Sequence, residues 1–326
     1  MRIDKGVRNI MTEQKRLRVL DANILYLVGA ILFWTIGVYF QSKDLQTGLI
    51  ITQYIIILLP PIIYIMAKRL SVKEVLKLNK ISFKHVFLII CITILVYPAA
   101  IFGNALLITI ISLLGNLNIP QLPMATNRGE YLVLIFIISI SAGICEEIFF
   151  RGFILSGYER MGKKKAVIFS AILFGIFHFN IYNLLGPIIL GLVFGYLVLE
   201  TGSIFAGMVG HIVNNGFAVT LGYILNLAAD FIPGTDAAGE MAVDMSVSLA
   251  MLVSTIMFGI ISVITLSIAY QLMKIIKRDR EKSGLEIYDK VGETDVKKAE
   301  FIPLIFTGIL FIIVIVIQIR EIISLG

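Results

Sequence analysis

Long apolar runs recur along this chain from residue 22 onward, with short polar intervals between them. A run of about 20 apolar residues is long enough to cross the hydrocarbon core of a bilayer as a helix. The runs lie near residues 22–41, 48–66, 86–114, 131–155, 166–179, 184–200, 203–225, 247–273 and 301–319. Only 15% of the 326 residues are charged and 58% are hydrophobic, a balance that excludes a water-soluble globule. We therefore predict an all-α polytopic membrane protein, a bundle of eight to nine transmembrane helices.

The distribution of Lys and Arg predicts how the bundle is oriented. Segments 1–21, 67–85, 151–165 and 274–300 together hold 25 of the 28 basic residues. Cytoplasmic loops of membrane proteins are enriched in these residues. We therefore expect a cytoplasmic N-terminus, and the Lys- and Ile-rich sequence favours a bacterial plasma membrane. The net charge of +6 belongs to these loops, so it does not indicate a nucleic-acid partner.

The polar intervals are too short to house a functional site. The longest, 274–300, is shorter than the roughly 50 residues of a small domain. A charge at bilayer depth costs at least about 2.5 kcal/mol, so ionisable residues inside the runs mark function. The candidates, with one polar companion, are Glu146, Glu147, Arg151, His178, His211 and Asn215. Together they predict a polar cavity inside the membrane.

Helical spacing suggests a role for each candidate. Glu147 and Arg151 stand four residues apart with the acid first, the favoured order for an ion pair. Glu146 points about 100° away round the helix, so we expect it to be left free. His211 and Asn215 are also four residues apart, and both side chains reach one spot, where they can donate hydrogen bonds to an oxyanion.

The depth of these residues is consistent with one site. At 1.5 Å of rise per residue, His178 and His211 lie about mid-membrane. Glu146 reaches the same depth only if its helix continues to about Tyr158, which would also bury Arg151. We expect the cavity to open toward the basic, cytoplasmic side.

Three motifs in the sequence resemble those of a known family. They are Glu146-Glu147-Ile-Phe-Phe-Arg151, Phe174-Gly-Ile-Phe-His178 and His211-Ile-Val-Asn-Asn215, in this order on successive helices. The sequence resembles the CAAX protease and bacteriocin-processing family of glutamic intramembrane endopeptidases. The resemblance implies that Glu146 with His178 activates a water and that His211 with Asn215 holds the oxyanion.

The resemblance also suggests how the chain is divided. Residues 131–225 would form the catalytic, CAAX-protease-like core. The remaining segments would be a basic cytoplasmic N-terminus at 1–21, N-terminal helices and loops at 22–130, and a C-terminal extension at 226–326 with a cytoplasmic loop at 274–300. The substrate would be a membrane-associated protein or peptide within the lipid bilayer.

Several alternatives stay open. No G-x-S-x-G or H-E-x-x-H motif is present, so a serine-hydrolase elbow and a zincin helix lack support. We expect no cofactor, although zinc held by Glu146, His178 and His211 has a feasible ligand set. Cys145 is a possible thiol nucleophile in an apolar setting. A non-catalytic membrane scaffold that regulates a partner enzyme and a transporter are the alternatives from other classes.

Overall fold

The structure is a computed structural model that describes residues 16–119, 123–231, 247–283 and 295–324. These residues form helices and no strand, which confirms the predicted all-α class. Eight helices in the described ranges are long and apolar enough to cross a membrane, and the chain is an integral multi-pass membrane protein. The predictions for residues 1–15, 232–246 and 284–294 lie outside the described residues.

Several spans are built from consecutive helical stretches, with π- or 3-10-helical segments labelled η. The first two are α2 (Val19–Leu32), η1 (Phe33–Gly37) and α3 (Val38–Lys43), then α4 (Leu45–Ile51), η2 (Thr52–Leu58) and α5 (Leu59–Ala67). After the short α6 (Val72–Val75), α7 (Phe83–Ile111) forms the third span. The fourth is α8 (Arg128–Leu134), η3 (Ile135–Ser141), α9 (Ala142–Glu147), η4 (Ile148–Ile154), α10 (Leu155–Tyr158) and η5 (Glu159–Met161).

The second half of the chain begins with a helical hairpin. The remaining elements are α11 (Lys163–Ile176), η6 (Ile181–Asn183), α12 (Leu185–Thr201), α13 (Ile204–Phe231), α15 (Val247–Lys282), η8 (Lys298–Phe301) and α16 (Ile302–Ser324). Helices α11 and α12 pack against each other so closely that a Cβ on Gly191 would lie 2.8 Å from Ala171 Cα. Because only glycine fits there, Gly191 sets the spacing of the hairpin.

One predicted span is shorter than expected. The apolar run at 166–179 forms α11, whose 14 residues extend about 21 Å, less than the roughly 30 Å of a hydrocarbon core. This run is therefore not among the eight helices of spanning length in the described part, so the count is the lower of the two predicted. The run was misread because its apolar composition does not reveal that α11 ends at a turn inside the bundle.

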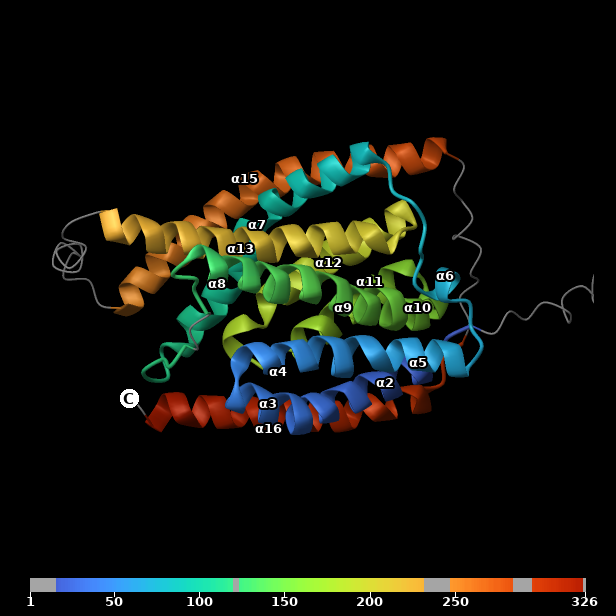
Figure 1. The fold of residues 1–326 in the computed structure, drawn as a ribbon, viewed down its shortest axis with the longest axis horizontal. Helices are drawn as coiled ribbons and strands as arrows, with labels where there is room; N and C mark the ends of the chain where they lie inside the picture. The colour runs from blue at the N-terminus through green and yellow to red at the C-terminus, as the bar shows by residue number, and fades with distance from the viewer. Residues whose placement is uncertain (1–15, 120–122, 232–246, 284–294, 325–326) are drawn as a thin grey trace, which may run out of the picture.

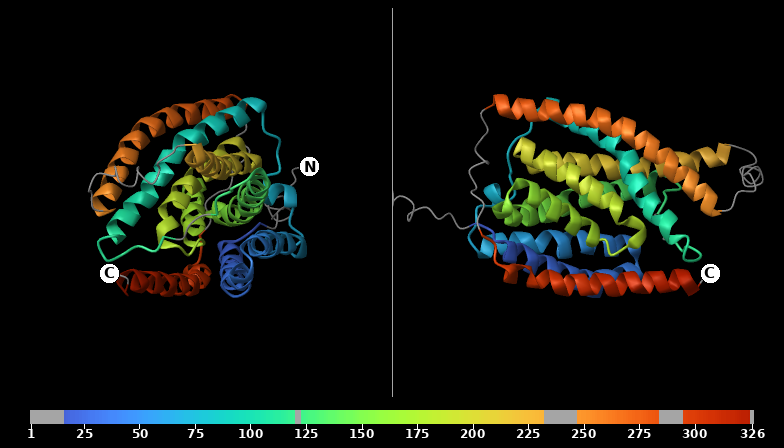
Figure 2. Two further views of the ribbon diagram at one scale, coloured as in Figure 1. Left: turned by 60° about the vertical axis from the view of Figure 1, so that its left-hand side comes forward. Right: turned by 180° about the vertical axis from the view of Figure 1, so that it is seen from behind.

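The helices lie roughly along one axis, so the bundle has two ends (Figures 1 and 2). One end, which we call the basic end, carries α6, α10 and the start of α11, with residues 68–82 and 159–165. The other, which we call the α8 end, carries the turn between α3 and α4, the start of α8 and the described residues of segment 112–127 (Figure 1). The positive charges therefore gather at one end, as a membrane orientation requires.

The outer surface and the interior are both apolar, as expected when lipid is the solvent. Long helices α15 and α16 expose Val263, Ile260, Ile312 and Ile317, each at least 60% accessible. Inside, aromatic rings such as Tyr26, Phe149, Phe150 and Phe153 are fully buried in one cluster. This cluster encloses the polar residues described next.

The helix that carries the two glutamates runs from Arg128 to Met161, which confirms that it continues to Tyr158. Arg151 is fully buried within it. It therefore belongs to the membrane interior and not to the basic end. Two π-helical segments, η3 and η4, flank α9. Such segments take some carbonyl groups out of the regular hydrogen-bond pattern and are frequent at functional sites.

Candidate active site

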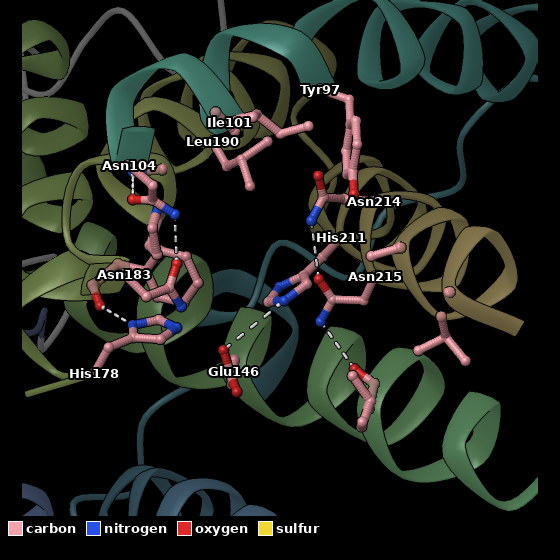
Figure 3. Close-up of a pocket in the computed structure, with 18 of the residues that line it drawn as sticks. Tyr97, Ile101, Asn104, Glu146, His178, Asn183, Leu190, His211, Asn214 and Asn215 are labelled. Carbon is pink, nitrogen blue, oxygen red and sulfur yellow. Dashed lines mark hydrogen bonds and ion pairs between the residues drawn. The ribbon is translucent and has the colours of Figure 1, made fainter. Parts of the chain in front are cut away.

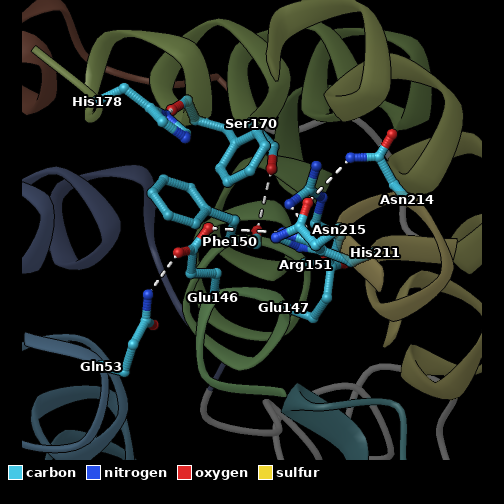
Figure 4. A network of polar contacts seen from close by, with 11 residues as sticks. Gln53, Glu146, Glu147, Phe150, Arg151, Ser170, His178, His211, Asn214 and Asn215 are labelled. Atoms are coloured by element: carbon cyan, nitrogen blue, oxygen red, sulfur yellow. Dashed lines mark hydrogen bonds and ion pairs between the residues drawn. The ribbon is translucent and has the colours of Figure 1, made fainter. Parts of the chain in front are cut away.

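Three regions of the chain bring the candidate residues to one place (Figures 3 and 4). The end of α9 and η4 supply Glu146, Glu147 and Arg151, the turn after α11 supplies His178, and α13 supplies His211 and Asn215. Glu146, His178, His211 and Asn215 line a common cavity of about 550 Å³. The sequence order of the motifs therefore becomes a spatial cluster.

Glu147 is the centre of a fully buried charge pair. Arg151 Nη1 lies 2.8 Å from Glu147 Oε1, and neither side chain is exposed. The guanidinium also lies over the ring of Phe174, 4.3 Å from its centroid. A Cβ on Gly207 would collide with Glu147 Oε2, so only glycine at this position of α13 leaves room for the carboxylate. The pair is thus held by charge, by cation–π contact and by close helix packing.

His211 joins this pair to the second glutamate. Its Nδ1 lies 2.9 Å from Glu147 Oε1, and its Nε2 lies 3.8 Å from Glu146 Oε2. Because a carboxylate only accepts, His211 Nδ1 carries the hydrogen. The ring stacks on Phe194 with centroids 6.0 Å apart. Glu147 therefore fixes the orientation of the imidazole and leaves Nε2 directed to Glu146 (Figure 4).

Glu146 faces the cavity with 14% of its side chain exposed. The sequence predicted that Glu146 would be left free. In the structure it has a partner, because Gln53 Nε2 donates a hydrogen bond of 2.7 Å to Glu146 Oε1. Gln53 belongs to η2 and is itself 7% exposed. The sequence contained a signal for it, a polar residue in the apolar run 48–66. Its partner could not be read from spacing, since 93 residues separate the two.

His178 lines the same cavity but does not touch Glu146. Its Nδ1 donates to Phe174 O at 2.9 Å, which leaves Nε2 as the acceptor of a neutral ring. Within the described ranges no polar contact joins His178 to Glu146, so a direct pair between these residues is absent.

The turn after His178 is held in an uncommon backbone conformation. Phe179 has φ +47°, in the left-handed region that non-glycine residues rarely adopt. Its carbonyl accepts a hydrogen bond of 2.8 Å from Gln318 Nε2 on α16, and its ring stacks on Phe33. Such conformations cost about 1–3 kcal/mol and cluster at functional sites. The left-handed Phe179 directly follows His178 in the turn after α11, whose last residue is Ile176.

Asn215 has two hydrogen-bond partners that the sequence spacing did not predict. Its Nδ2 donates to Ile138 O of η3 at 2.8 Å, and its Oδ1 accepts from Asn214 Nδ2 at 2.9 Å. His211 directs Nδ1 to Glu147, so each of the two side chains already has a protein partner besides the oxyanion that the sequence predicts for them. Spacing alone could not reveal this, because the competing acceptor is a carbonyl of a π-helical segment 77 residues away.

The cavity extends toward the α8 end and not toward the basic end. Beyond the candidate residues its lining includes Tyr97, Asn104, Met124, Asn183, Leu190 and Gly222. The expectation of an opening at the basic side is therefore wrong. It rested on charge alone, whereas the basic side of the site is filled by the buried Glu147–Arg151 pair and its aromatic neighbours.

The part of the chain that carries these motifs matches a known family. Residues 128–217 match the family described as Type II CAAX prenyl endopeptidase Rce1-like. This confirms the predicted family resemblance. This Rce1-like segment contains all six candidate residues, and its family supports an intramembrane protease. No curated protein and no solved structure matches the chain.

Two alternatives for the Rce1-like segment can be compared with its geometry. In the described residues no group of three or more His, Cys, Asp or Glu side chains is arranged to hold a metal ion, so Glu146, His178 and His211 do not form a chelating set. Cys145 is fully buried and is not among the residues that line the cavity. Neither a zinc ligand set nor an accessible thiol is therefore built here.

Proposed function

We propose that this chain is a CAAX-type glutamic endopeptidase of the membrane, which hydrolyses a peptide bond in a membrane-associated protein or peptide. The observation that supports it most directly is the common cavity. A carboxylate, two imidazoles and an amide face one space of about 550 Å³, a volume typical of ligand sites. Peptide hydrolysis needs a base for water and donors for the developing oxyanion.

Glu146 is the proposed base. Its carboxylate accepts a proton from a water molecule, whose oxygen attacks the peptide carbonyl carbon. His178 Nε2 accepts the second hydrogen of that water and orients it. The carbon–nitrogen bond then breaks, and the proton held by Glu146 passes to the leaving amine. Gln53 holds one carboxylate oxygen of Glu146 and leaves the other for the water.

His211 and Asn215 are the proposed oxyanion donors. His211 donates from Nδ1 to Glu147 and directs Nε2 toward Glu146 and the cavity, where a hydrogen on Nε2 would reach the oxyanion. The amide of Asn215 uses one N–H for Ile138 O, and its second N–H remains for the oxyanion. Glu147 and Arg151 act behind this layer, because they hold His211 and do not face the cavity lining.

The proposal is tested by comparing protein termini in membranes. Cells carrying the wild-type chain, Glu146→Gln or no copy are compared for new N-termini in membrane proteins. We expect the wild type to produce termini that the other two lack, because an amide does not take a proton from water. Glu281→Gln is the matched control, since this glutamate on α15 is 63% exposed and far from the cavity.

The same experiment distinguishes a scaffold from an enzyme. A scaffold that regulates a partner would act through its surface, so Glu146→Gln at normal abundance would behave like the wild type. Identical termini in the wild type and in Glu146→Gln would therefore contradict the proposed function.

A further inference from the structure

The cavity follows two helices in the same direction. On α13 it is lined by His211, Asn215, Ala218 and Gly222, with no lining residue before His211. From His211 to Gly222 the helix rises about 16 Å toward the α8 end. On α7, which also runs toward that end, the lining begins at Tyr97 and continues to Asn104 (Figure 3). Both helices thus line a passage from the candidate active site to the α8 end.

Exposure increases along this passage. His211 is 4% exposed and Asn214 is 9% exposed. Residues Ala218 and Gly222 are half-buried. Met124, beside the start of α8, is 60% exposed and also lines the cavity. The passage is therefore open at the α8 end.

The opposite direction is closed by packed side chains. Glu147 and Arg151 are fully buried directly behind Glu146. The next turns toward the basic end contain Phe150, Phe153 and Leu155, all with no exposed surface. A close-packed interior of this kind has no room for a peptide chain. Access from the basic end would require these residues to move apart.

The lining also restricts the chemistry of what can bind. The acid in it is Glu146, and none of its lining residues in the described ranges is Lys or Arg. No lysine or arginine of the lining would therefore offset the charge of a carboxylate placed beside Glu146. Beside the Tyr97 hydroxyl and the two imidazoles, amide side chains supply the other polar groups of the lining. Asn104 Nδ2 donates to Asn183 Oδ1 at 2.8 Å on one wall, and Asn214 Oδ1 on the other is buried without a hydrogen-bond partner in the described part.

Such amides match the backbone of a peptide. Peptide N–H and C=O groups that leave water need partners, and an unpartnered buried Asn214 Oδ1 accepts one N–H. The apolar residues between the amides, including Ile101 and Leu190, suit uncharged side chains. The site therefore fits an uncharged, extended stretch of polypeptide.

On the basis of the function proposed above, we propose that the substrate is an uncharged peptide segment presented at the face opposite the basic end. It reaches Glu146 through the passage between α7 and α13. Because Lys and Arg mark the cytoplasmic side, this is the non-cytoplasmic face. The substrate would therefore enter at the membrane face opposite the basic loops.

The route is tested by cysteine labelling, which does not require turnover. Ala218→Cys, and independently Val219→Cys, are treated with a membrane-impermeant thiosulfonate reagent in right-side-out and in inverted membrane vesicles. Leu113→Cys, 78% exposed, reports the α8 end, and Lys73→Cys reports the basic end. Mass spectrometry identifies the labelled residue, and Val263→Cys on the lipid-facing surface of α15 controls for leakage.

We expect Ala218→Cys and Val219→Cys to react in the same vesicles as Leu113→Cys. Reaction together with Lys73→Cys, in both vesicle types or in neither would overturn the proposed route. A failure of the proposed function would be seen separately, as normal turnover in Glu146→Gln. The two results are independent, because cysteine labelling does not require the site to hydrolyse peptides.

The charge preference is tested with the same variants. A cationic and an anionic thiosulfonate are compared at Ala218→Cys, with each rate divided by the rate at Leu113→Cys. We expect the normalised rate of the cationic reagent to be about tenfold higher than that of the anionic one, because the carboxylate of Glu146 lines the cavity. Adding Glu146→Gln should reduce this ratio toward one. A preference for the anionic reagent would contradict the proposed substrate chemistry.

Discussion

Gln53 on the second span donates a hydrogen bond of 2.7 Å from Nε2 to Oε1 of Glu146 on the fourth. The contact joins a helix outside the Rce1-like segment to the carboxylate proposed as base. Gln53 Oε1 is buried without a hydrogen-bond partner in the described residues, so the bond from Nε2 to Glu146 sets the orientation of the Gln53 amide. The N-terminal helices thus contribute to the site and do not only anchor it.

Gln53→Met should lower turnover without unfolding the protein. A hydrogen bond to a charged group contributes about 1.5–3 kcal/mol, so we expect a loss of about 10- to 100-fold in kcat. The pH–rate profile should shift as well, because the environment of the base changes. Gln46→Met, an exposed glutamine on the same span, is the control. An unchanged profile and rate in Gln53→Met would show that the contact has no catalytic part.

The buried pair Glu147–Arg151 should be measured by a double-mutant cycle. Removing either partner leaves an uncompensated buried charge, so Glu147→Gln and Arg151→Gln should each lose about 3–5 kcal/mol of stability. The double variant should recover part of that loss. Recovery stays incomplete because Glu147 also accepts from His211. Thermal unfolding in detergent measures the cycle.

Glu146→Gln is the matched comparison for this cycle. Its carboxylate faces the cavity, and among the described residues its one basic partner within 4 Å is His211 at 3.8 Å. It should therefore keep thermal stability and membrane abundance while losing turnover. Equal destabilisation in Glu146→Gln and Glu147→Gln would contradict the different roles assigned to the two residues.

Gly207→Ala tests the close approach of α13 to Glu147. The added methyl group would collide with Glu147 Oε2, so we expect a lower unfolding temperature and reduced turnover. Gly308→Ala is the control, because a Cβ at this position of α16 has no neighbour within 4 Å. That change should be neutral or stabilise by up to about 1 kcal/mol, the helix-propensity difference. The same loss in both variants would refute a specific collision.

Activity should persist in metal chelators and after Cys145→Ala. The described residues contain no chelating group of three acids, histidines or cysteines, and the Cys145 thiol does not line the cavity. The measurement is peptide hydrolysis by the purified protein. Its substrate is one that the comparison of N-termini in membrane proteins identifies as cleaved. Activity lost to a chelator and restored by zinc would favour the metal alternative.

The membrane orientation predicted from charge is tested by reporter fusions. A reporter after Lys282 should be cytoplasmic and one after Asp44 should lie outside, because basic residues mark the inner face. The opposite result would reverse the faces. The passage would still open opposite the basic end, since that relation is internal to the fold.

The sequence by itself determined the membrane class and the candidate residues of the site. Apolar runs are read directly from composition, because lipid requires every spanning backbone to be helical. The motif residues stand out because charged groups are costly in such runs. Glu147 and Arg151 could also be placed together, because a spacing of four residues on one helix fixes their distance.

Only the tertiary structure decided which groups face one another across helices. Apolar composition could not show that α11 ends inside the bundle, nor that Gln53 reaches Glu146 and Ile138 O reaches Asn215. It also could not show the direction of the cavity. Helix spacing fixes neighbours within one helix, whereas contacts between helices depend on rotation and depth, which are set by packing at residues such as Gly191 and Gly207.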